Sequence, residues 1–177
     1  MRFKRPAGFF QDGTTKERGS ALKRIAAAAL LCGSMMFAQS NEPAGFHYWT
    51  RADLDKAANG LAPQMDKNGF KTQILADAGN HRFQITHREA GGESEYHESL
   101  SDVVFVQSGR ATLIYGGKMV DAKTTAPGEM RGTGIEGGMR RILEAGDVVV
   151  IPSKLPHQFT PEKGAAFNYF VVKVADQ

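Results

Sequence analysis

Two separate segments of the sequence carry side chains that could bind a metal ion together. In the first segment Glu95 and His97 stand two positions apart, and Asp102 follows five positions later. Residues i and i+2 of a β-strand point to the same face of a sheet, so Glu95 and His97 would project together. The second segment supplies His157. Two imidazoles with one or two carboxylates make a hard, partly anionic site that suits one divalent ion, with Mn²⁺, Fe²⁺ and Zn²⁺ all left open.

Cysteine chemistry is excluded from the predicted mature domain. Cys32 is the only cysteine of the chain, and it lies in the N-terminal leader described below. Neither a disulfide nor a thiolate ligand is therefore available, and any metal must be held by nitrogen and oxygen atoms.

The segment that contains these residues has the pattern of an all-β protein. From Lys71 onward, short runs rich in Val, Ile, Phe and Thr alternate with turns marked by Gly and Asn, which predicts an all-β sandwich or barrel. The strands predicted on this pattern are Lys71–Ala76, Arg82–Arg88, Asp102–Val106, Ala111–Tyr115, Arg140–Leu143, Val148–Ile151 and Phe167–Val174.

The first of the two segments resembles motif one of the cupin superfamily. That motif has the form H-x-H, three or four residues, E, six residues, G. Here the sequence reads Glu95-x-His97, four residues, Asp102, six residues, Gly109. The spacing agrees, while Glu95 stands where the first His is usual and Asp102 is one methylene shorter than the usual Glu.

The second segment is similar to motif two of the same superfamily, which has the form G, five residues, P-x-G, two residues, H, three residues, N. Here it reads Gly146, five residues, Pro152-x-Lys154, two residues, His157, three residues, Pro161. The spacing again agrees, and the two changed residue types fall in turns.

The resemblance implies a jelly-roll barrel, the double-stranded β-helix, with a metal ion inside its open end. It carries the ligand positions of the superfamily onto Glu95, His97, Asp102 and His157. For Asp102 two alternatives remain open: contact with the metal through a water, or capping of the start of its strand.

Several other residues are left with two interpretations. Gln84 and Arg88 could supply a free polar group beside the metal. His87 lies either in the pocket or outside the barrel. Phe105 and Phe159 are interpreted as barrel core, with a pocket wall as the alternative. The segment 118–138, rich in glycine, is either a binding loop or a surface hairpin.

The N-terminal part of the chain predicts a leader and an extension. Residues 1–40 combine basic residues, an apolar run of 14 residues from Ile25 to Ala38 and small residues around Ala38-Gln39-Ser40, as in a secretory signal peptide. An uncleaved membrane anchor is the alternative, but a spanning helix needs about 20 residues. Residues 41–70 form an extension with one short helix that begins after Thr50, and residues 71–177 form the barrel.

The positive net charge of the chain comes from the basic residues of this leader. The net charge is +3, but residues 1–40 hold seven of the 22 Lys and Arg and only two of the 19 acids. The mature domain is thus weakly acidic, which gives no case for nucleic acid binding.

The sequence therefore predicts an exported cupin, periplasmic or secreted, with one divalent metal ion and no membrane span after cleavage. A metal-dependent enzyme of oxygenase, lyase or isomerase type acting on a small organic molecule is the first hypothesis. A non-catalytic protein that binds or senses a small ligand through a structural metal is the second, since the fold does not settle the activity. Pairing of barrels into a homodimer is expected from the resemblance.

Overall fold

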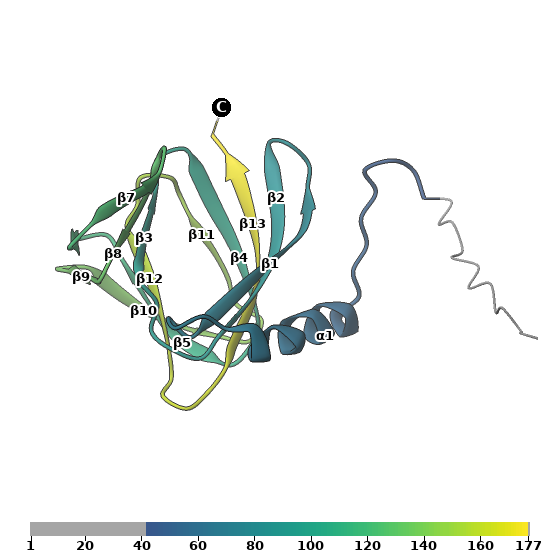
Figure 1. Ribbon diagram of the computed structural model, residues 1–177, viewed down its shortest axis with the longest axis horizontal. Helices are drawn as coiled ribbons and strands as arrows, with labels where there is room; N and C mark the ends of the chain where they lie inside the picture. The colour runs from purple at the N-terminus through teal and green to yellow at the C-terminus, as the bar shows by residue number, and fades with distance from the viewer. Residues whose placement is uncertain (1–41, 177) are drawn as a thin grey trace, which may run out of the picture. The chain divides into compact units, whose positions relative to one another are not determined.

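The computed structural model describes residues 42–176, and the predicted signal peptide over 1–40 lies outside them. Within the described residues, no helix is both long and apolar enough to cross a membrane. Figure 1 shows this part of the chain as the coloured ribbon.

The predicted short helix is present as α1, Arg51–Leu61. Thr50 caps it: the Thr50 hydroxyl accepts a hydrogen bond from the backbone N–H of Asp53 at 3.1 Å, and the Asp53 carboxylate accepts one from the backbone N–H of Thr50 at 3.0 Å. This reciprocal capping box fixes the first turn. The helix continues into a short 3₁₀ turn, Ala62–Gln64, and buries Ala58 and Leu61 against Ile85 of the barrel.

Thirteen strands follow within the described residues, and the predicted all-β barrel is confirmed. The strands are β1 (Phe70–Asp77), β2 (His81–Arg88), β3 (Ser94–His97), β4 (Leu100–Ser108), β5 (Arg110–Tyr115), β6 (Lys118–Val120), β7 (Lys123–Ala126), β8 (Glu129–Gly132), β9 (Gly134–Glu136), β10 (Met139–Glu144), β11 (Val148–Ile151), β12 (His157–Pro161) and β13 (Phe167–Ala175). One sheet has the order β1-β2-β13-β4-β11, the second β10-β5-β12-β3-β8-β7, and β6 pairs with β9. Every pairing is antiparallel.

The segment 118–138 is not a loop. It forms β6 to β9, and β8 joins the second sheet beside β3. Each interpretation holds in part, because the segment is paired into hairpins and its strand β8 supplies Arg131 to the cavity described below. The strands are three or four residues long, with most residues exposed or only partly buried, and Gly128 at positive φ forms the turn between β7 and β8. Pairing with neighbouring strands, rather than local propensity, stabilises such short strands, which is why the sequence pattern missed them.

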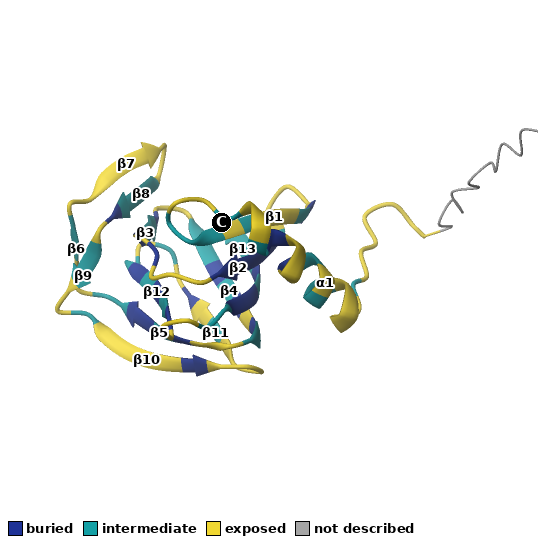
Figure 2. Cartoon of the chain, turned by 60° about the horizontal axis from the view of Figure 1, so that its bottom comes forward, coloured by how far each residue is buried: buried dark blue, intermediate teal, exposed yellow. Residues whose placement is uncertain are grey.

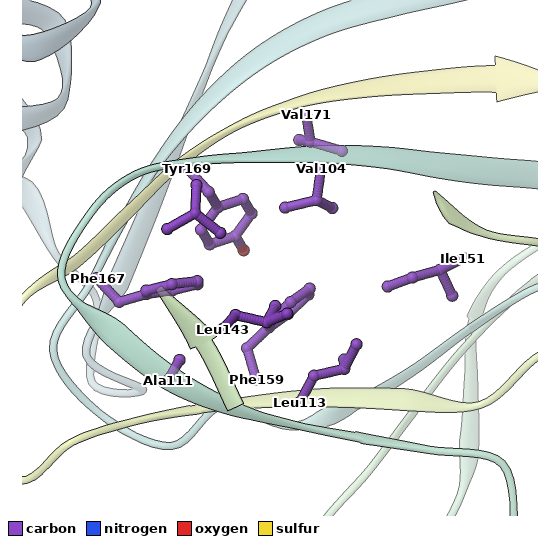
Figure 3. Close-up of a cluster of buried hydrophobic side chains, with 10 residues drawn as sticks. Val104, Ala111, Leu113, Leu143, Ile151, Phe159, Phe167, Tyr169 and Val171 are labelled. Atoms are coloured by element: carbon purple, nitrogen blue, oxygen red, sulfur yellow. The ribbon is translucent and has the colours of Figure 1, made fainter. Parts of the chain in front are cut away.

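The core lies between the two sheets and fills one end of the barrel (Figure 3). On β4, β12 and β13 every second side chain points inward. The inward residues run from polar at one end to apolar at the other: Asp102, Val104 and Val106 on β4; His157 and Phe159 on β12; Lys173, Val171, Tyr169 and Phe167 on β13. The barrel therefore has a close-packed apolar end and an end lined by ionisable side chains.

The two aromatic residues interpreted as core, Phe105 and Phe159, differ in their exposure to solvent. Phe159 is 3% exposed and stacks on Tyr169 with ring centroids 5.1 Å apart, as a core residue should. Phe105 is 36% exposed and lies on the outer face of its sheet, because Val104 and Asp102 take the inward positions of β4. Burial along each strand is shown in Figure 2.

Candidate metal site

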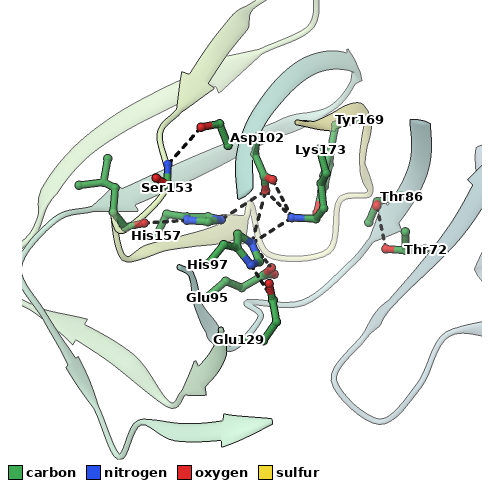
Figure 4. Close-up of polar contacts among 12 residues, drawn as sticks. Thr72, Thr86, Glu95, His97, Asp102, Glu129, Ser153, His157, Tyr169 and Lys173 are labelled. Carbon is green, nitrogen blue, oxygen red and sulfur yellow. Dashed lines mark hydrogen bonds and ion pairs between the residues drawn. The ribbon is translucent and has the colours of Figure 1, made fainter. Parts of the chain in front are cut away.

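Strand register explains how the candidate residues meet. His157 lies opposite Glu95 in the pairing of β12 with β3, and β4 and β13 place Asp102 opposite Lys173. Directly opposed side chains on one face of a sheet have Cβ atoms about 5 Å apart. Both pairs point into the polar end of the barrel (Figure 4). Glu95, His97 and His157 each offer one ligand atom, and these atoms lie within 4.8 Å of one another.

The two imidazoles present their Nε2 atoms to the same space. The Nδ1–H of His157 donates to the carbonyl of Leu155 at 3.1 Å, which leaves the lone pair on Nε2. His157 is 1% exposed, and its Nε2 has no hydrogen-bond partner among residues 42–176. Burial lowers the pKa of His157 and keeps the ring neutral, although Glu95 and Asp102 oppose this effect. A neutral ring with a free, buried Nε2 is the form that binds a metal.

His97 is oriented in the same way by a carboxylate. Its Nδ1–H donates to Oε2 of Glu129 at 2.7 Å, so its Nε2 also carries a lone pair. This contact follows from register, since β3 and β8 place His97 opposite Glu129. A carboxylate on the far nitrogen of a ligand histidine fixes the ring and raises its basicity.

Glu95 supplies the anionic ligand position. Its Oε2 lies 3.6 Å from Nε2 of His97, close to the roughly 3.4 Å between two ligands of a tetrahedral ion with bonds of about 2.1 Å. Arg131 lies opposite Glu95 on β8 and approaches it to 3.5 Å. Burial alone would raise the pKa of Glu95, but the positive charge of Arg131, helped by other cations nearby, lowers it, so the carboxylate is ionised at neutral pH.

Asp102 lies beside this group but is held by Lys173. The Lys173 ammonium donates to both carboxylate oxygens, at 2.7 and 2.8 Å, and to Nε2 of His97 at 2.9 Å. The Oδ2 atom of Asp102 is 3.6 Å from Nε2 of His97 and 3.7 Å from Nε2 of His157. Burial would raise the pKa of Asp102, but contact with His97 and the charge of Lys173 lower it to about 2. The role of Asp102 as a metal ligand stays a prediction.

Three residues of the site were missed by sequence reasoning: Lys173, Glu129 and Arg131. The alternation Phe167, Tyr169, Val171 on β13 would have placed Lys173 on the inward face. Glu129 and Arg131 repeat the i, i+2 spacing of Glu95 and His97, but they lie in the segment not recognised as strand.

A cavity of about 260 Å³ opens beside the candidate ligands. Gln84 and Arg88 line it, as one interpretation of the sequence proposed. The same alternation places His87 on the opposite face of β2, where it contacts Asn168 at 2.7 Å and Glu89 at 2.9 Å, so His87 lies outside the cavity. The walls of the cavity are formed by Phe70, Thr72, Gln84, Thr86, Arg88, Glu95, Asp102, Arg131, Phe159, Tyr169, Val171 and Lys173.

The turn before His157 has a lysine, Lys154, at the glycine position of motif two. Lys154 has φ = 63°, in the left-handed region, and its N–H donates to the carbonyl of His97 at 2.7 Å. A side chain in this conformation costs about 1–2 kcal/mol.

Lys154→Gly is therefore expected to stabilise the protein by about 0.5–1 kcal/mol, because relief of this strain outweighs the added freedom of the unfolded chain. The ion pair of Lys154 with Glu98, 3.5 Å long and exposed, contributes little. Urea denaturation measures the change, with Lys163→Gly, in which no left-handed residue is replaced, as the control. A loss of stability equal to that of the control would contradict the strain.

Comparison with known proteins supports the fold. No protein-family model and no curated protein sequence matches the chain. Among solved structures, an uncharacterized conserved protein with a double-stranded beta-helix domain from Klebsiella pneumoniae is similar over 75% of this chain and 92% of its own, at 15% identity and a TM-score of 0.52.

Weaker similarities connect the chain to larger proteins. Oxalate oxidase in complex with glycolate gives 15% identity and a TM-score of 0.45, over 63% of this chain and 54% of its own. The Fe(II) form of HppE gives 14% identity and a TM-score of 0.47, over 62% of this chain and 53% of its own. The chain thus spans about half the length of these two proteins.

The order of strands, the two facing sheets and the similarity to the Klebsiella protein define a double-stranded β-helix. This is the fold that the resemblance of the two sequence motifs predicted.

Proposed function

We propose that this protein binds one divalent transition-metal ion through Glu95, His97 and His157 and acts on a small organic molecule held in the adjoining cavity. The observation that carries the proposal is the buried Nε2 of His157, which has no partner within the described residues and faces the ligand atoms of Glu95 and His97. Leaving a polar atom buried and unpaired costs about 1–3 kcal/mol, and a metal ion at this position would remove that cost.

Two histidines and one carboxylate form the ligand set used by non-haem Fe²⁺ oxygenases, which leaves coordination positions open. Mn²⁺ and Zn²⁺ also fit these ligands, so the identity of the ion is left to experiment. A bound ion would supply Lewis acidity and a place for substrate or O₂. The chain itself contributes the buried environment, the orientation of both imidazoles and the charges of Lys173 and Arg131.

Asp102 is assigned here as the counter-ion of Lys173 rather than as a fourth ligand. The lone pair of His97 Nε2 cannot serve Lys173 and a metal at once. Lys173 would therefore leave His97 when the metal binds and keep its two hydrogen bonds to Asp102.

Elemental analysis of the purified protein, without an affinity tag, tests the proposal. One equivalent of Fe, Mn or Zn per chain supports it, and less than a tenth of an equivalent after loading with each ion in turn contradicts it.

Nitric oxide binding to the Fe²⁺-loaded protein then distinguishes a metal-dependent enzyme from a non-catalytic binding protein. An enzyme has an open position that takes up nitric oxide, whereas a structural metal in a non-catalytic binding protein has none.

We also propose that the protein is exported. The support is the tripartite pattern of residues 1–40, which lie outside the described residues. Mass spectrometry of the protein secreted by a host cell would give a mature N-terminus near Ser40, while retention of Met1 would contradict cleavage.

A homodimer is proposed through the outer face of the first sheet. Apolar side chains of its edge strand and the neighbouring strand are exposed there: Val148 by 57%, Val150 by 63% and Phe105 by 36%. A second copy that covers this face would bury these three apolar side chains. Light scattering should give twice the monomer mass, and Val150→Lys should reduce it to the monomer; a wild-type monomer at high micromolar concentration would contradict the dimer.

A further inference from the structure

We infer that the cavity beside the candidate metal site takes a small organic carboxylate, anchored by the guanidinium of Arg88. The inference deepens the proposed function, since it names the chemical class of ligand for that same site. Its support comes from Arg88 itself, from the charges around the cavity and from the cavity's size.

Arg88 occupies a position shaped to hold it. It is 1% exposed, points inward from β2 and lines the cavity. Its guanidinium lies 4.4 Å from the centroid of the Phe70 ring, a cation–π contact. Gly92 also lies against the guanidinium, where a Cβ atom would collide with Nη1 of Arg88. Close packing against Phe70 and Gly92 therefore limits the positions open to this side chain.

The hydrogen-bonding capacity of Arg88 is largely unused. Its nearest polar neighbours are the Tyr169 hydroxyl at 3.5 Å and Oε1 of Glu95 at 3.6 Å, both long, and both on Nη2. The Nε and Nη1 atoms are buried and have no hydrogen-bond partner among residues 42–176. A guanidinium carries five N–H donors in a planar fork that matches the two oxygens of a carboxylate. A buried arginine with so few partners indicates that an acceptor from outside the chain completes the site.

The charges of the site would have a positive excess once a divalent metal ion is bound, which favours an anionic ligand. Three cations, Arg88, Arg131 and Lys173, lie around the ligand group and cavity. Three carboxylates, Glu95, Asp102 and Glu129, balance them. A divalent ion adds two positive charges to this buried region. Since uncompensated buried charge is unfavourable, a negatively charged ligand would be favoured over a neutral one of the same shape.

The size and walls of the cavity define the rest of the ligand. A volume of about 260 Å³ lies below the range of about 300–1,000 Å³ typical of sites for drug-sized molecules. Phe70, Phe159 and Val171 offer apolar contact, while Gln84 and Thr86 offer hydrogen bonds. These walls fit a short carboxylic acid with an apolar body.

Calorimetric titration tests the inference on the metal-loaded protein. The probes are acetate, butyrate, benzoate and phenylacetate, each compared with its own amide, which has nearly the same shape but no charge. At least one acid is expected to bind at least tenfold more tightly than its amide. If no acid exceeds its amide, or if inorganic phosphate binds more tightly than every acid, the carboxylate class is overturned.

Substitution of Arg88 tests whether its guanidinium binds the carboxylate. Arg88→Gln is expected to reduce binding of the preferred acid at least tenfold and leave binding of its amide unchanged. Arg110→Gln is the control, because Arg110 lies on the surface, paired with Glu144 and Glu162. A folded Arg88→Gln protein that keeps full acid preference would contradict the role of Arg88. Should that variant not fold, the acid–amide comparison on the unmodified protein still decides the ligand class.

The same titrations on the metal-free protein separate this inference from the proposed function. Arg88 is present in both forms, so a weaker preference for the acid should persist without metal. A protein that prefers acids but binds no metal would refute the metal proposal alone. A protein that binds metal but shows no preference for acids would refute this inference alone.

Discussion

His157→Ala is expected to lower the affinity of the protein for Zn²⁺ by more than about 100-fold. Removal of a histidine's hydrogen-bond partner in a metal site already costs about 10–100-fold, and loss of the ligand itself should cost more. The neutral, buried ring of His157 has its Nδ1–H held by Leu155, so its Nε2 is available without rearrangement. His97→Ala should have a similar effect. Competition with a chromogenic chelator measures both affinities.

Two further variants make this prediction specific. His87 is also buried, at 3% exposure, but lies outside the cavity, so His87→Ala should leave Zn²⁺ affinity unchanged. Glu129→Gln should weaken binding by about tenfold, since Glu129 only orients the ring of His97. Equal losses in His157→Ala and His87→Ala would indicate damage to the fold and contradict the ligand assignment. Full retention of Zn²⁺ by folded His157→Ala would contradict it too.

The sequence was sufficient to predict that Glu95, His97 and His157 lie together, because strand periodicity and the resemblance to the two motifs both place them. The period of two residues in a strand places Glu95 and His97 on one face, and motif spacing places His157 at the start of another strand. The structure adds the reason for their meeting, which is the pairing of β12 with β3. Hydrophobic alternation similarly predicted most of the strands in the two sheets, and the Thr50–Asp53 pair predicted the start of α1.

The partners of the ligands could not be predicted, because they depend on pairing between distant strands: alternation along β13 indicates that Lys173 faces inward, but not that it meets Asp102. Glu129 reaches His97 through the register of β8 with β3, and Lys173 reaches Asp102 through the register of β13 with β4. One residue of slip in either pairing would turn these side chains to the opposite face. No local pattern in the sequence specifies that register.

The pair formed by Asp102 and Lys173 is expected to stabilise the fold, independently of any metal. Their side chains are only 6% and 16% exposed. Removing one partner of a buried ion pair leaves an uncompensated charge and typically costs about 3–5 kcal/mol. Asp102→Asn should therefore lower the free energy of unfolding of the metal-free protein by about that amount in urea. Glu98→Gln, which breaks the exposed pair with Lys154, should change it by less than about 0.5 kcal/mol.

The pH dependence of stability should show the same pair. The pKa of Asp102 falls from 3.8 in the unfolded chain to about 2 in the folded protein. A lowered folded-state pKa means that the stabilisation is complete above pH 3.8 and is lost as the pH falls toward 2, which corresponds to about 2–3 kcal/mol. Asp102→Asn should abolish this part of the acid dependence.

Replacement of both partners distinguishes a counter-ion from a ligand. Asp102→Asn combined with Lys173→Met should recover most of the stability lost in Asp102→Asn alone, because no unpaired charge remains.

Lys173→Met by itself should raise Zn²⁺ affinity by at least about tenfold. It removes a competitor for the lone pair of His97 and a positive charge, and unit charges about 4 Å apart interact by about 4 kcal/mol at an effective dielectric constant of 20. If Asp102 were a ligand, the double variant would lose Zn²⁺ affinity as strongly as His157→Ala does. If Asp102 is the counter-ion, the double variant should bind Zn²⁺ at least as tightly as the unmodified protein.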